Sequence, residues 1–337
     1  MATNDAPNGA RPTLKTIAFM TGLGVSTVSQ ALKDAPDISR ATKQRVQLVA
    51  KQIGYRPNRA GVRLRTGKTN VIALVLNTKE EGMGLVSEMV YGISEALANT
   101  SYHLVVTPYS LADPMAPVRY IVETGSADGI ILSRTQPDDP RVRYMVDHGM
   151  PFATHGRTDM AVIHPYHDFD NQAFAYEAVK ILVGKGRKNI ALLGPPQGMM
   201  FQKHTRSGFE QALREFGLAE FWLGDINIDS STADIVALGR NLGRAQNRPD
   251  AIICSAAIAA IAITAGLIDS GIKIGGQMDI VSKQSTHLLD LFRPEMIYIH
   301  EDFRAAGHDL AKFVMAWIEG ADPASLQFIA KPSNRSK

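Results

Sequence analysis

From residue 70 onward, short apolar runs alternate with longer segments of helical periodicity, and this alternation constrains the fold more than any other feature of the chain. Runs that are apolar at successive positions are typical of parallel strands buried on both faces. They are VIALVL (71–76), HLVVTP (103–108), DGIIL (128–132), PFATH (151–155), NIALLG (189–194), DAIIC (250–254), DIVS (279–282) and MIYIH (296–300). The helical patterns lie near 84–99, 115–124, 139–148, 171–185, 200–217, 231–245, 256–270 and 303–319. Strand–helix alternation of this kind predicts doubly wound parallel sheets.

The size of this region indicates more than one sheet. About eight strands over roughly 270 residues exceed one ordinary core, so we expect two α/β lobes. Ligands of such sheets bind beyond the carboxyl ends of the strands. The chain has no apolar stretch of about 18 residues and no secretory signal, so we expect a cytoplasmic protein without a membrane partner. The one cysteine, Cys254, fits that reducing compartment.

The first 70 residues are much more basic than the rest of the chain. They hold 12 Lys/Arg and 3 Asp/Glu, whereas the remainder holds 24 Lys/Arg and 30 Asp/Glu. A basic end on an acidic body is typical of a segment that binds a polyanion, although a solvated basic face has the same composition. Charge alone leaves both interpretations open.

The pattern at 13–57 predicts three short helices after a disordered lead at 1–12. Thr13 is suited to cap the first helix and Ser39 the third. The first two helices are joined by the tight turn Thr21-Gly22-Leu23-Gly24. Two helices joined in this way form a DNA-binding helix-turn-helix when the second fits the major groove.

The second helix, from about Val25 to Leu32, is the expected recognition helix. Val28 and Leu32 are four residues apart, so they share one face and can pack inward. The rest of the helix presents the expected base readers Val25, Ser26, Thr27 and Gln30, with Ser29 at the edge. Glutamine pairs bidentately with adenine, serine and threonine reach bases or phosphates, and valine contacts a thymine methyl group.

The segment TLKTIAFMTGLGVSTVSQALKDAPDISRATKQRVQLVAKQIGYRPNRAGVRLRTGKT resembles the N-terminal module of the LacI/GalR family of bacterial transcription factors. The resemblance rests on the joint spacing of Thr27-Val28-Ser29, Tyr55-Arg56-Pro57-Asn58 and Leu64. It implies a sequence-specific regulator without enzymatic activity, namely a repressor of carbohydrate-utilisation genes. It also implies a two-fold homodimer on a palindromic operator.

The resemblance assigns a role to the linker at 58–69 as well. In the family this hinge helix enters the minor groove, where a leucine wedges between base pairs. Leu64 matches that leucine. The expected phosphate and minor-groove contacts are Ser29, Tyr55, Asn58, Arg59, Gly61 and Leu64. From the residues alone, a flexible basic linker fits as well.

Three positions depart from the family pattern. Gly24 stands where a serine usually begins the recognition helix, and Lys33 replaces an asparagine. Gly61 replaces the usual hinge alanine. Glycine inside a helix costs roughly 1 kcal/mol relative to alanine, so we expect the hinge to fold less readily and operator binding to depend more on the effector state.

The region 70–332 resembles the ligand domain of the same family, which is similar to periplasmic sugar-binding proteins. The resemblance implies one lobe of about 70–168 with 300–320 and a second of about 170–298 with 321–332, closing on a sugar-like effector. The expected effector contacts are Arg206, Arg157, Asp170, Asn171, His155, Lys283 and Gln284. Arg206 matches the family's Arg–x–Gly–Phe pattern, with a surface salt bridge as the alternative. Asp170-Asn171 either contacts the ligand or caps the following helix.

Other chemistries leave weaker patterns. His155, His164, His167 and Asp168 lie within 14 residues, but hydrogen bonding suits this irregular segment better than metal binding. The stretch 194–198 contains prolines and lacks the ending of a phosphate loop, and no nucleophile elbow or dinucleotide fingerprint occurs. We therefore expect no cofactor and no metal. A sugar-binding protein or sugar-acting enzyme carrying a fused DNA-binding module is the alternative function.

Overall fold

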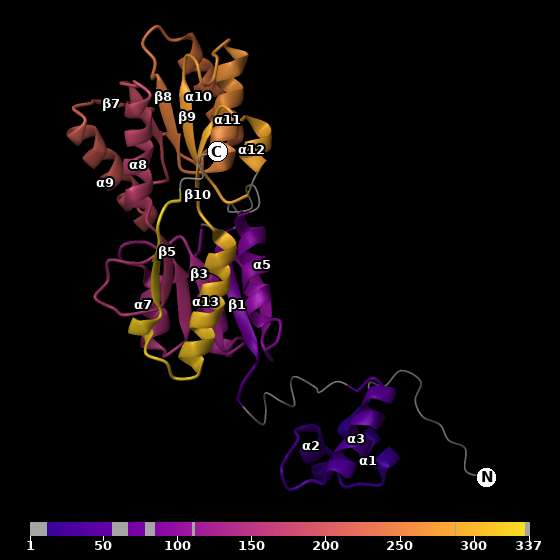
Figure 1. Cartoon of the computed structure of the whole chain (residues 1–337). Helices are drawn as coiled ribbons and strands as arrows, with labels where there is room; N and C mark the ends of the chain where they lie inside the picture. Colours follow the sequence, from indigo (N-terminus) through magenta and orange to yellow (C-terminus); the bar gives the residue numbers. More distant parts are fainter. Residues whose placement is uncertain (1–11, 56–66, 78–84, 110–111, 287, 334–337) are drawn as a thin grey trace. The chain divides into compact units, whose positions relative to one another are not determined.

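The computed structural model describes residues 12–55, 67–77, 85–109, 112–286 and 288–333 (Figure 1). The chain divides into two compact units, Met1–Thr69 and Asn70–Lys337. Of the expected lead at 1–12, all but Pro12 lies outside the described residues. The same holds for the expected hinge residues Asn58, Arg59, Gly61 and Leu64.

Within residues 12–55, the first unit has three helices, α1 (Leu14–Thr21), α2 (Val25–Leu32) and α3 (Arg40–Gln52). Thr13 caps α1 in a reciprocal capping box, and the Ser39 side chain accepts a hydrogen bond at the start of α3. Gly22 ends α1 with φ 67°, a left-handed conformation that glycine adopts without a steric penalty. The helices meet in a core of Ile17, Ala18, Val28, Ala31, Val46 and Ala50.

The second unit contains two parallel sheets among its described residues. The first consists of β1 (Val71–Asn77), β2 (His103–Tyr109), β3 (Gly129–Ser133), β4 (Phe152–His155), β5 (Tyr166–Phe169) and β11 (Gln327–Ala330), in the order β11-β5-β4-β3-β1-β2. The second consists of β6 (Ile190–Leu193), β7 (Glu220–Phe221), β8 (Ala251–Cys254), β9 (Asp279–Gln284) and β10 (Ile297–His300), in the order β10-β9-β8-β6-β7. This confirms the predicted fold class, a small helical domain followed by a two-lobed α/β domain.

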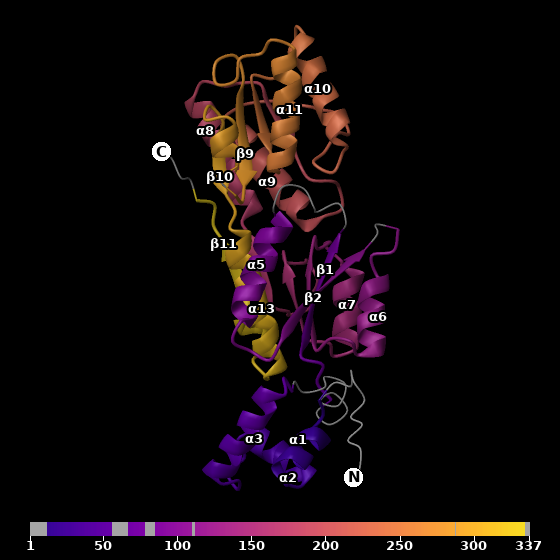
Figure 2. The same cartoon turned by 90° about the vertical axis from the view of Figure 1, so that its right-hand side faces the viewer.

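Helices cover both faces of each sheet. Around the first sheet lie α5 (Leu85–Leu97) and α13 (Phe303–Ile318) on one face, and α6 (Ala116–Thr124) and α7 (Pro140–Asp147) on the other (Figure 2). Around the second lie α8 (Asn171–Gly184) and α9 (Met200–Glu215) on one face, and α10 (Thr232–Arg244) and α11 (Ala257–Asp269) on the other. The short α12 (Leu288–Phe292) follows β9, and the turn η2 (Pro323–Ser325) precedes β11.

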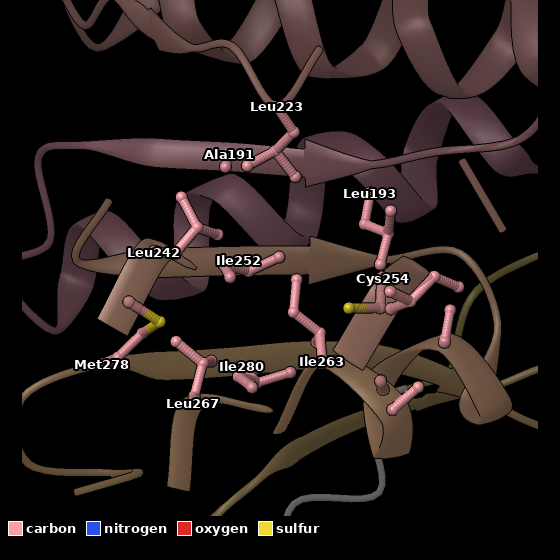
Figure 3. Close-up of a cluster of buried hydrophobic side chains, with 14 of the residues drawn as sticks. Ala191, Leu193, Leu223, Leu242, Ile252, Cys254, Ile263, Leu267, Met278 and Ile280 are labelled. Atoms are coloured by element: carbon pink, nitrogen blue, oxygen red, sulfur yellow. The ribbon is translucent and has the colours of Figure 1, made fainter. Parts of the chain in front are cut away.

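The strands are apolar on both faces because both faces are covered. In β8, Ile252 and Cys254 pack with α10 and α11, whereas Ala251 and Ile253 pack with α8 and α9. Figure 3 shows the first of these cores, in which Ile263 and Leu267 of α11 lie against β8 and β9. Buried Cys254 belongs to this core, and burial strongly raises the pKa of its thiol, which therefore stays protonated.

The chain passes between the lobes after β5, after β10 and after β11. The third passage corrects the expected lobe boundary, because we assigned 321–332 to the second lobe. Strand β11 instead pairs with β5 and forms the edge of the first sheet. The chain reaches the second lobe only afterwards, where Ser333 forms a bridge with His300. Parallel pairing along β5 satisfies backbone groups that the edge of the first sheet would otherwise expose.

Candidate nucleic-acid interface and ligand cavity

Helix α2 buries one side and exposes the other. Val28 and Ala31 are fully buried in the core of the first unit. Val25 keeps 42% of its surface exposed. Ser26 and Gln30 are exposed as well, and Thr27 and Ser29 are half-buried at the edge. The predicted base-reading residues thus lie on the outer part of α2, and their contacts with DNA remain a prediction.

Charged groups in the described part of this unit are mostly basic and exposed. Lys15, Lys33, Arg40, Arg45 and Lys51 are exposed, as are the acidic side chains of Asp34 and Asp37. Lys43 pairs with Asp34 at 2.8 Å and donates a hydrogen bond to its backbone carbonyl at 3.1 Å. The pair ties α3 to the loop that follows α2 and leaves the other cations at the surface.

Gly24 begins α2 without a side-chain cap, as the sequence predicts. Tyr55, another predicted DNA contact, is half-buried against the core of the unit. Its backbone N–H donates to the Ala50 carbonyl at 2.8 Å and so holds the end of α3.

A cavity of about 1210 Å³, counting the space that is open to solvent, lies at the carboxyl ends of strands from both sheets of the second unit. Ligands of doubly wound sheets bind at this end of the strands. The first-lobe strands bring Leu76, Ser133, Arg134, Thr135, His155, Gly156 and Asp168 to it. The second lobe brings Asn171, Phe201, Ile228, Asp229, residues 255–258 and residues 283–286. Val86, Met89, Glu301 and Phe303 complete the lining.

Lys283 is a buried cation of this lining. Its ammonium group donates to the Asn171 side-chain oxygen at 2.8 Å and to Glu301 Oε2 at 2.8 Å. The rings of Phe169 and Phe174 lie 5.1 and 5.5 Å from the same nitrogen. A cation buried to this degree is stable because a carboxylate, an amide and two aromatic faces replace its water.

Arg134 joins the two lobes at the wall of the cavity. Its guanidinium group forms a two-bond ion pair with the Asp229 carboxylate and lies 5.6 Å from the Phe201 ring. Arg134 has φ 56°, a conformation that costs energy for a residue with a side chain. The guanidinium of buried Arg141 donates to the Arg134 carbonyl at 2.9 Å and so supports this strained backbone.

Burial shifts two titrating groups of the lining in opposite directions. Burial lowers the pKa of His155 to about 4, with Glu301 opposing the shift at a distance of 3.8 Å. Burial also raises the pKa of Asp168 to about 6, although Arg157 at 3.3 Å favours the carboxylate. At pH 7 the imidazole is therefore neutral and Asp168 is charged.

Four of the seven predicted effector contacts line the cavity, namely His155, Asn171, Lys283 and Gln284. Asp170 does not, and its side chain instead caps α8 by accepting from the Ala173 N–H at 2.9 Å. Arg157 does not line the cavity either, and it contacts Asp168 and His204. The roles of all these residues in effector binding remain predictions.

Arg206 lies away from the lining, and its role as an effector contact remains a prediction. Its guanidinium is held by Glu210 on α9 and by both carboxylate oxygens of Glu220 on β7, and it does not line the cavity. The physical reason is helix phase. Phe201 lines the cavity and Thr205, one turn later, is fully buried, so Arg206 lies about 100° around the helix from that side.

Three charged lining residues escaped prediction from the sequence. They are Arg134, Asp229 and Glu301. Arg134 directly follows β3 and Glu301 directly follows β10, so the rule that selects carboxyl ends of strands also selects them. Asp229 lies eight residues beyond the two-residue strand β7, which the sequence does not reveal.

The histidine-rich segment has other uses. The His164 ring forms hydrogen bonds with the hydroxyl groups of Thr154 and Thr158, and His167 Nδ1 lies 3.0 Å from Asp309 Oδ2. The described residues contain no cluster of three or more potential metal ligands. Within the same residues, no helix is long and apolar enough to cross a membrane.

Comparison with known proteins adds independent findings. A family model for bacterial regulatory proteins of the lacI family matches residues 13–58, and a model for periplasmic binding proteins and the sugar binding domain of the LacI family matches 69–332. The chain is 30% identical over 319 residues to the HTH-type transcriptional regulator AglR of Rhizobium meliloti, covering 90% of this chain and 87% of AglR.

Solved structures show the same fold. The lac repressor dimer bound to operator and the anti-inducer ONPF has a TM-score of 0.83 at 18% identity, covering 96% of this chain and 97% of that one. A complex of the transcriptional regulator CelR with cellobiose has a TM-score of 0.68 at 24% identity, covering 97% and 99%. At these identities the likeness concerns the fold.

Proposed function

Because the chain belongs to the LacI family of bacterial regulatory proteins, we propose that it represses carbohydrate-utilisation genes under the control of a sugar-like effector. The chain is a DNA-binding transcriptional regulator, and its similar proteins are regulators rather than enzymes. The observation that carries the effector proposal is the cavity between the lobes, where polar groups from both sheets converge among apolar side chains.

The proposed DNA partner is a palindromic operator, bound by a homodimer. Support comes from the fold, which the lac repressor dimer shares while bound to its operator. A two-fold dimer presents two recognition helices, so its site has two related halves. In this arrangement Val25, Ser26, Thr27 and Gln30 read bases, and Ser29, Tyr55 and the segment 58–64 contact the backbone and minor groove.

The proposed mechanism is reciprocal coupling between effector and operator. The effector stabilises one arrangement of the lobes, and the operator stabilises one spacing of the two DNA-binding units. If these arrangements differ, each ligand weakens the binding of the other by the same factor. We propose that they differ, so that the effector releases the operator and induces transcription.

The first test measures both ligands together. The full-length protein is titrated onto labelled duplex from its own upstream region by fluorescence anisotropy, with a scrambled duplex as control, and neutral sugars are then added. Tight binding to the upstream duplex alone, reversed by one sugar, is the expected result. Equal salt-sensitive binding to both duplexes, unchanged by every sugar, would contradict the proposal.

The base-reading role of α2 has its own test. Gln30→Ala is expected to weaken binding to the upstream duplex by about tenfold or more, because a lost base contact costs roughly 1–3 kcal/mol, while the scrambled duplex binds as before. Arg45→Ala, which changes an exposed cation on α3, should instead weaken both duplexes alike. Equal losses on the two duplexes for Gln30→Ala would remove this residue from base reading.

A further inference from the structure

Each cation that lines the cavity in the described residues already has a carboxylate partner. Arg134 is paired with Asp229 through two hydrogen bonds. Lys283 is paired with Glu301 at 2.8 Å and also hydrogen-bonds Asn171. His155 adds no positive charge at neutral pH, because burial holds its pKa at about 4. Within this lining, no cationic group stands ready to receive a negatively charged ligand.

The same lining is rich in hydrogen-bond acceptors. It contains three carboxylates, Asp168, Asp229 and Glu301, against the two cations just described. Gln284 Oε1 is buried and has no hydrogen-bond partner, and buried Asp168 Oδ2 forms an ion pair with Arg157 at 3.3 Å but accepts no hydrogen bond. The Gln284 amide nitrogen already donates to Asp290, which fixes the oxygen as the unpaired end. Buried acceptors without partners are costly, and a ligand that donates hydrogen bonds removes this cost.

One further unpaired group is a hydroxyl, and much of the remaining lining is apolar. Ser255 Oγ is buried without a hydrogen-bond partner and can both donate and accept. The apolar lining comes from both lobes and includes Leu76, Met89, Phe201, Ile228 and Phe303. A ring that carries hydroxyl groups at its edge and C–H groups on its faces satisfies both kinds of surface.

We propose that the cavity selects an uncharged polyhydroxyl ligand and excludes phosphorylated and carboxylated sugars. The inference rests on the proposed function and narrows its effector to one chemical class. Selection arises from the pairing of charges. To form an ion pair in the cavity, an anionic ligand has to replace Glu301 as the partner of Lys283 or Asp229 as the partner of Arg134. Either exchange leaves a buried carboxylate beside a second negative charge, and such like-charge contacts are strongly unfavourable.

The test is a matched panel of sugars on the full-length protein. The probes are maltose, cellobiose and sucrose, the phosphate ester of each at a primary hydroxyl, and the corresponding uronic acids. Binding is measured by calorimetry at neutral pH. At least one neutral sugar is expected to bind, with its phosphate and uronate forms weaker by about 100-fold or more, since like-charge burial costs several kcal/mol.

Asp168→Asn tests the electrostatic cause. The substitution keeps the size of the side chain and removes one negative charge from the lining. It is expected to narrow the ratio between the neutral and anionic dissociation constants by roughly tenfold. Asp269→Asn is the matched control, because this exposed carboxylate on α11 pairs with Arg240 and does not line the cavity. The control should leave the ratio unchanged.

The outcomes separate this inference from the proposed function. A phosphate or uronate form that binds as tightly as its neutral parent, and releases the operator, overturns the charge selection but leaves the effector-controlled repressor intact. An unchanged ratio in Asp168→Asn also overturns it. If no sugar of either kind binds while the upstream duplex still does, both the selection and the sugar effector are overturned.

Discussion

At the residue scale, burial shifts the pKa values of two groups in the cavity lining more than their charged neighbours do. The imidazole of His155 is kept neutral even though Glu301 lies 3.8 Å away, because loss of water outweighs that attraction. Asp168 is shifted toward its neutral form by the same cause, despite Arg157. Both shifts make the stability of the second unit depend on pH, and they act with opposite sign.

His155 makes the folded protein less stable in acid. The pKa of its imidazole is about 4 in the folded state, against an ordinary value of 6.5, so the stability present above pH 6.5 is lost as pH falls toward 4. This loss amounts to about 3 kcal/mol by linkage. In urea unfolding followed by circular dichroism at pH 7.5 and 4, His155→Gln should show a correspondingly smaller acid loss.

Two further variants, at Asp168 and at the exposed His148, are compared with His155→Gln in the same unfolding experiment. Because the pKa of Asp168 is raised to about 6, its contribution is largest at low pH and is lost as pH rises through 6. Asp168→Asn should therefore lose more stability in acid than the wild type does. His148→Gln alters an exposed histidine beyond α7 and should follow the wild type. The same acid loss in His155→Gln as in the wild type would contradict the prediction.

Arg206 is expected to matter little for the effector. Its partners Glu210 and Glu220 hold it outside the cavity, and the pair is partly exposed. Arg206→Ala should leave the effector dissociation constant within about twofold and cost at most about 1 kcal/mol of stability. Gln284→Ala, which removes a lining amide, should weaken effector binding clearly in the same calorimetric assay. Loss of effector binding in Arg206→Ala would restore the role that the sequence suggested.

At the element scale, close helix crossings depend on glycine. Helices α10 and α11 meet at Gly239 and Gly266, and α5 and α13 meet at Gly92 and Gly307. A methyl group at any of these positions would overlap a backbone carbonyl of the facing helix. The helices therefore pack backbone against backbone over the sheet, and side-chain rearrangement cannot make room.

Gly266→Ala is expected to destabilise the second unit by about 2 kcal/mol or more, because overpacking here pushes against the Val236 carbonyl of α10. Gly184→Ala is the matched control at the end of α8, since no atom lies within 4 Å of the added methyl group. That variant should gain roughly 0.5–1 kcal/mol from the lower flexibility of the unfolded chain. Chemical denaturation measures both, and equal effects would contradict the crossing argument.

At the scale of the whole molecule, polar contacts link the lobes along one side of the cavity. Besides the Arg134–Asp229 pair, the Met200 N–H donates to the Thr135 carbonyl at 2.8 Å, and Lys203 pairs with Asp159. Each contact joins the first lobe to α9 or to the loop before α10. These contacts link the lobes in the absence of a ligand, and the free energy of effector binding adds to theirs.

A double-mutant cycle tests this link. Arg134→Gln and Asp229→Asn should each weaken effector binding, because either change removes an interaction that holds the lobes closed. The double variant should lose little more than either single one, since the pair acts as a unit. Small-angle scattering should show a larger radius of gyration for the variants without effector. If the losses in effector-binding free energy are fully additive, or if the radius of gyration is unchanged, the Arg134–Asp229 pair does not hold the lobes together.

Much of the fold follows from local patterns. All eight apolar runs that predict strands become strands of the two sheets, and six of them lie inside a sheet, where a strand covered on both faces needs apolar residues at successive positions. Strand β11 escaped detection because its side chains are mostly exposed and its pairing with β5 joins segments far apart in the chain. The two-residue strand β7 escaped for lack of length. Strand β5 corrects the expectation of an irregular segment at 155–168, because its sequence YHDF has no apolar run that would predict a strand.

By itself, the sequence determined the class of the protein. Capping residues, helix periodicity and apolar runs act over a few residues, so they can be recognised from the sequence alone. Only the tertiary structure decided which side chains share the cavity. Arg134 meets Asp229 from 95 positions away, and Lys283 meets Asn171 from 112. Such pairings depend on how the lobes pack and on the phase of each helix, and Arg206, one position past Thr205, was turned outward by that phase.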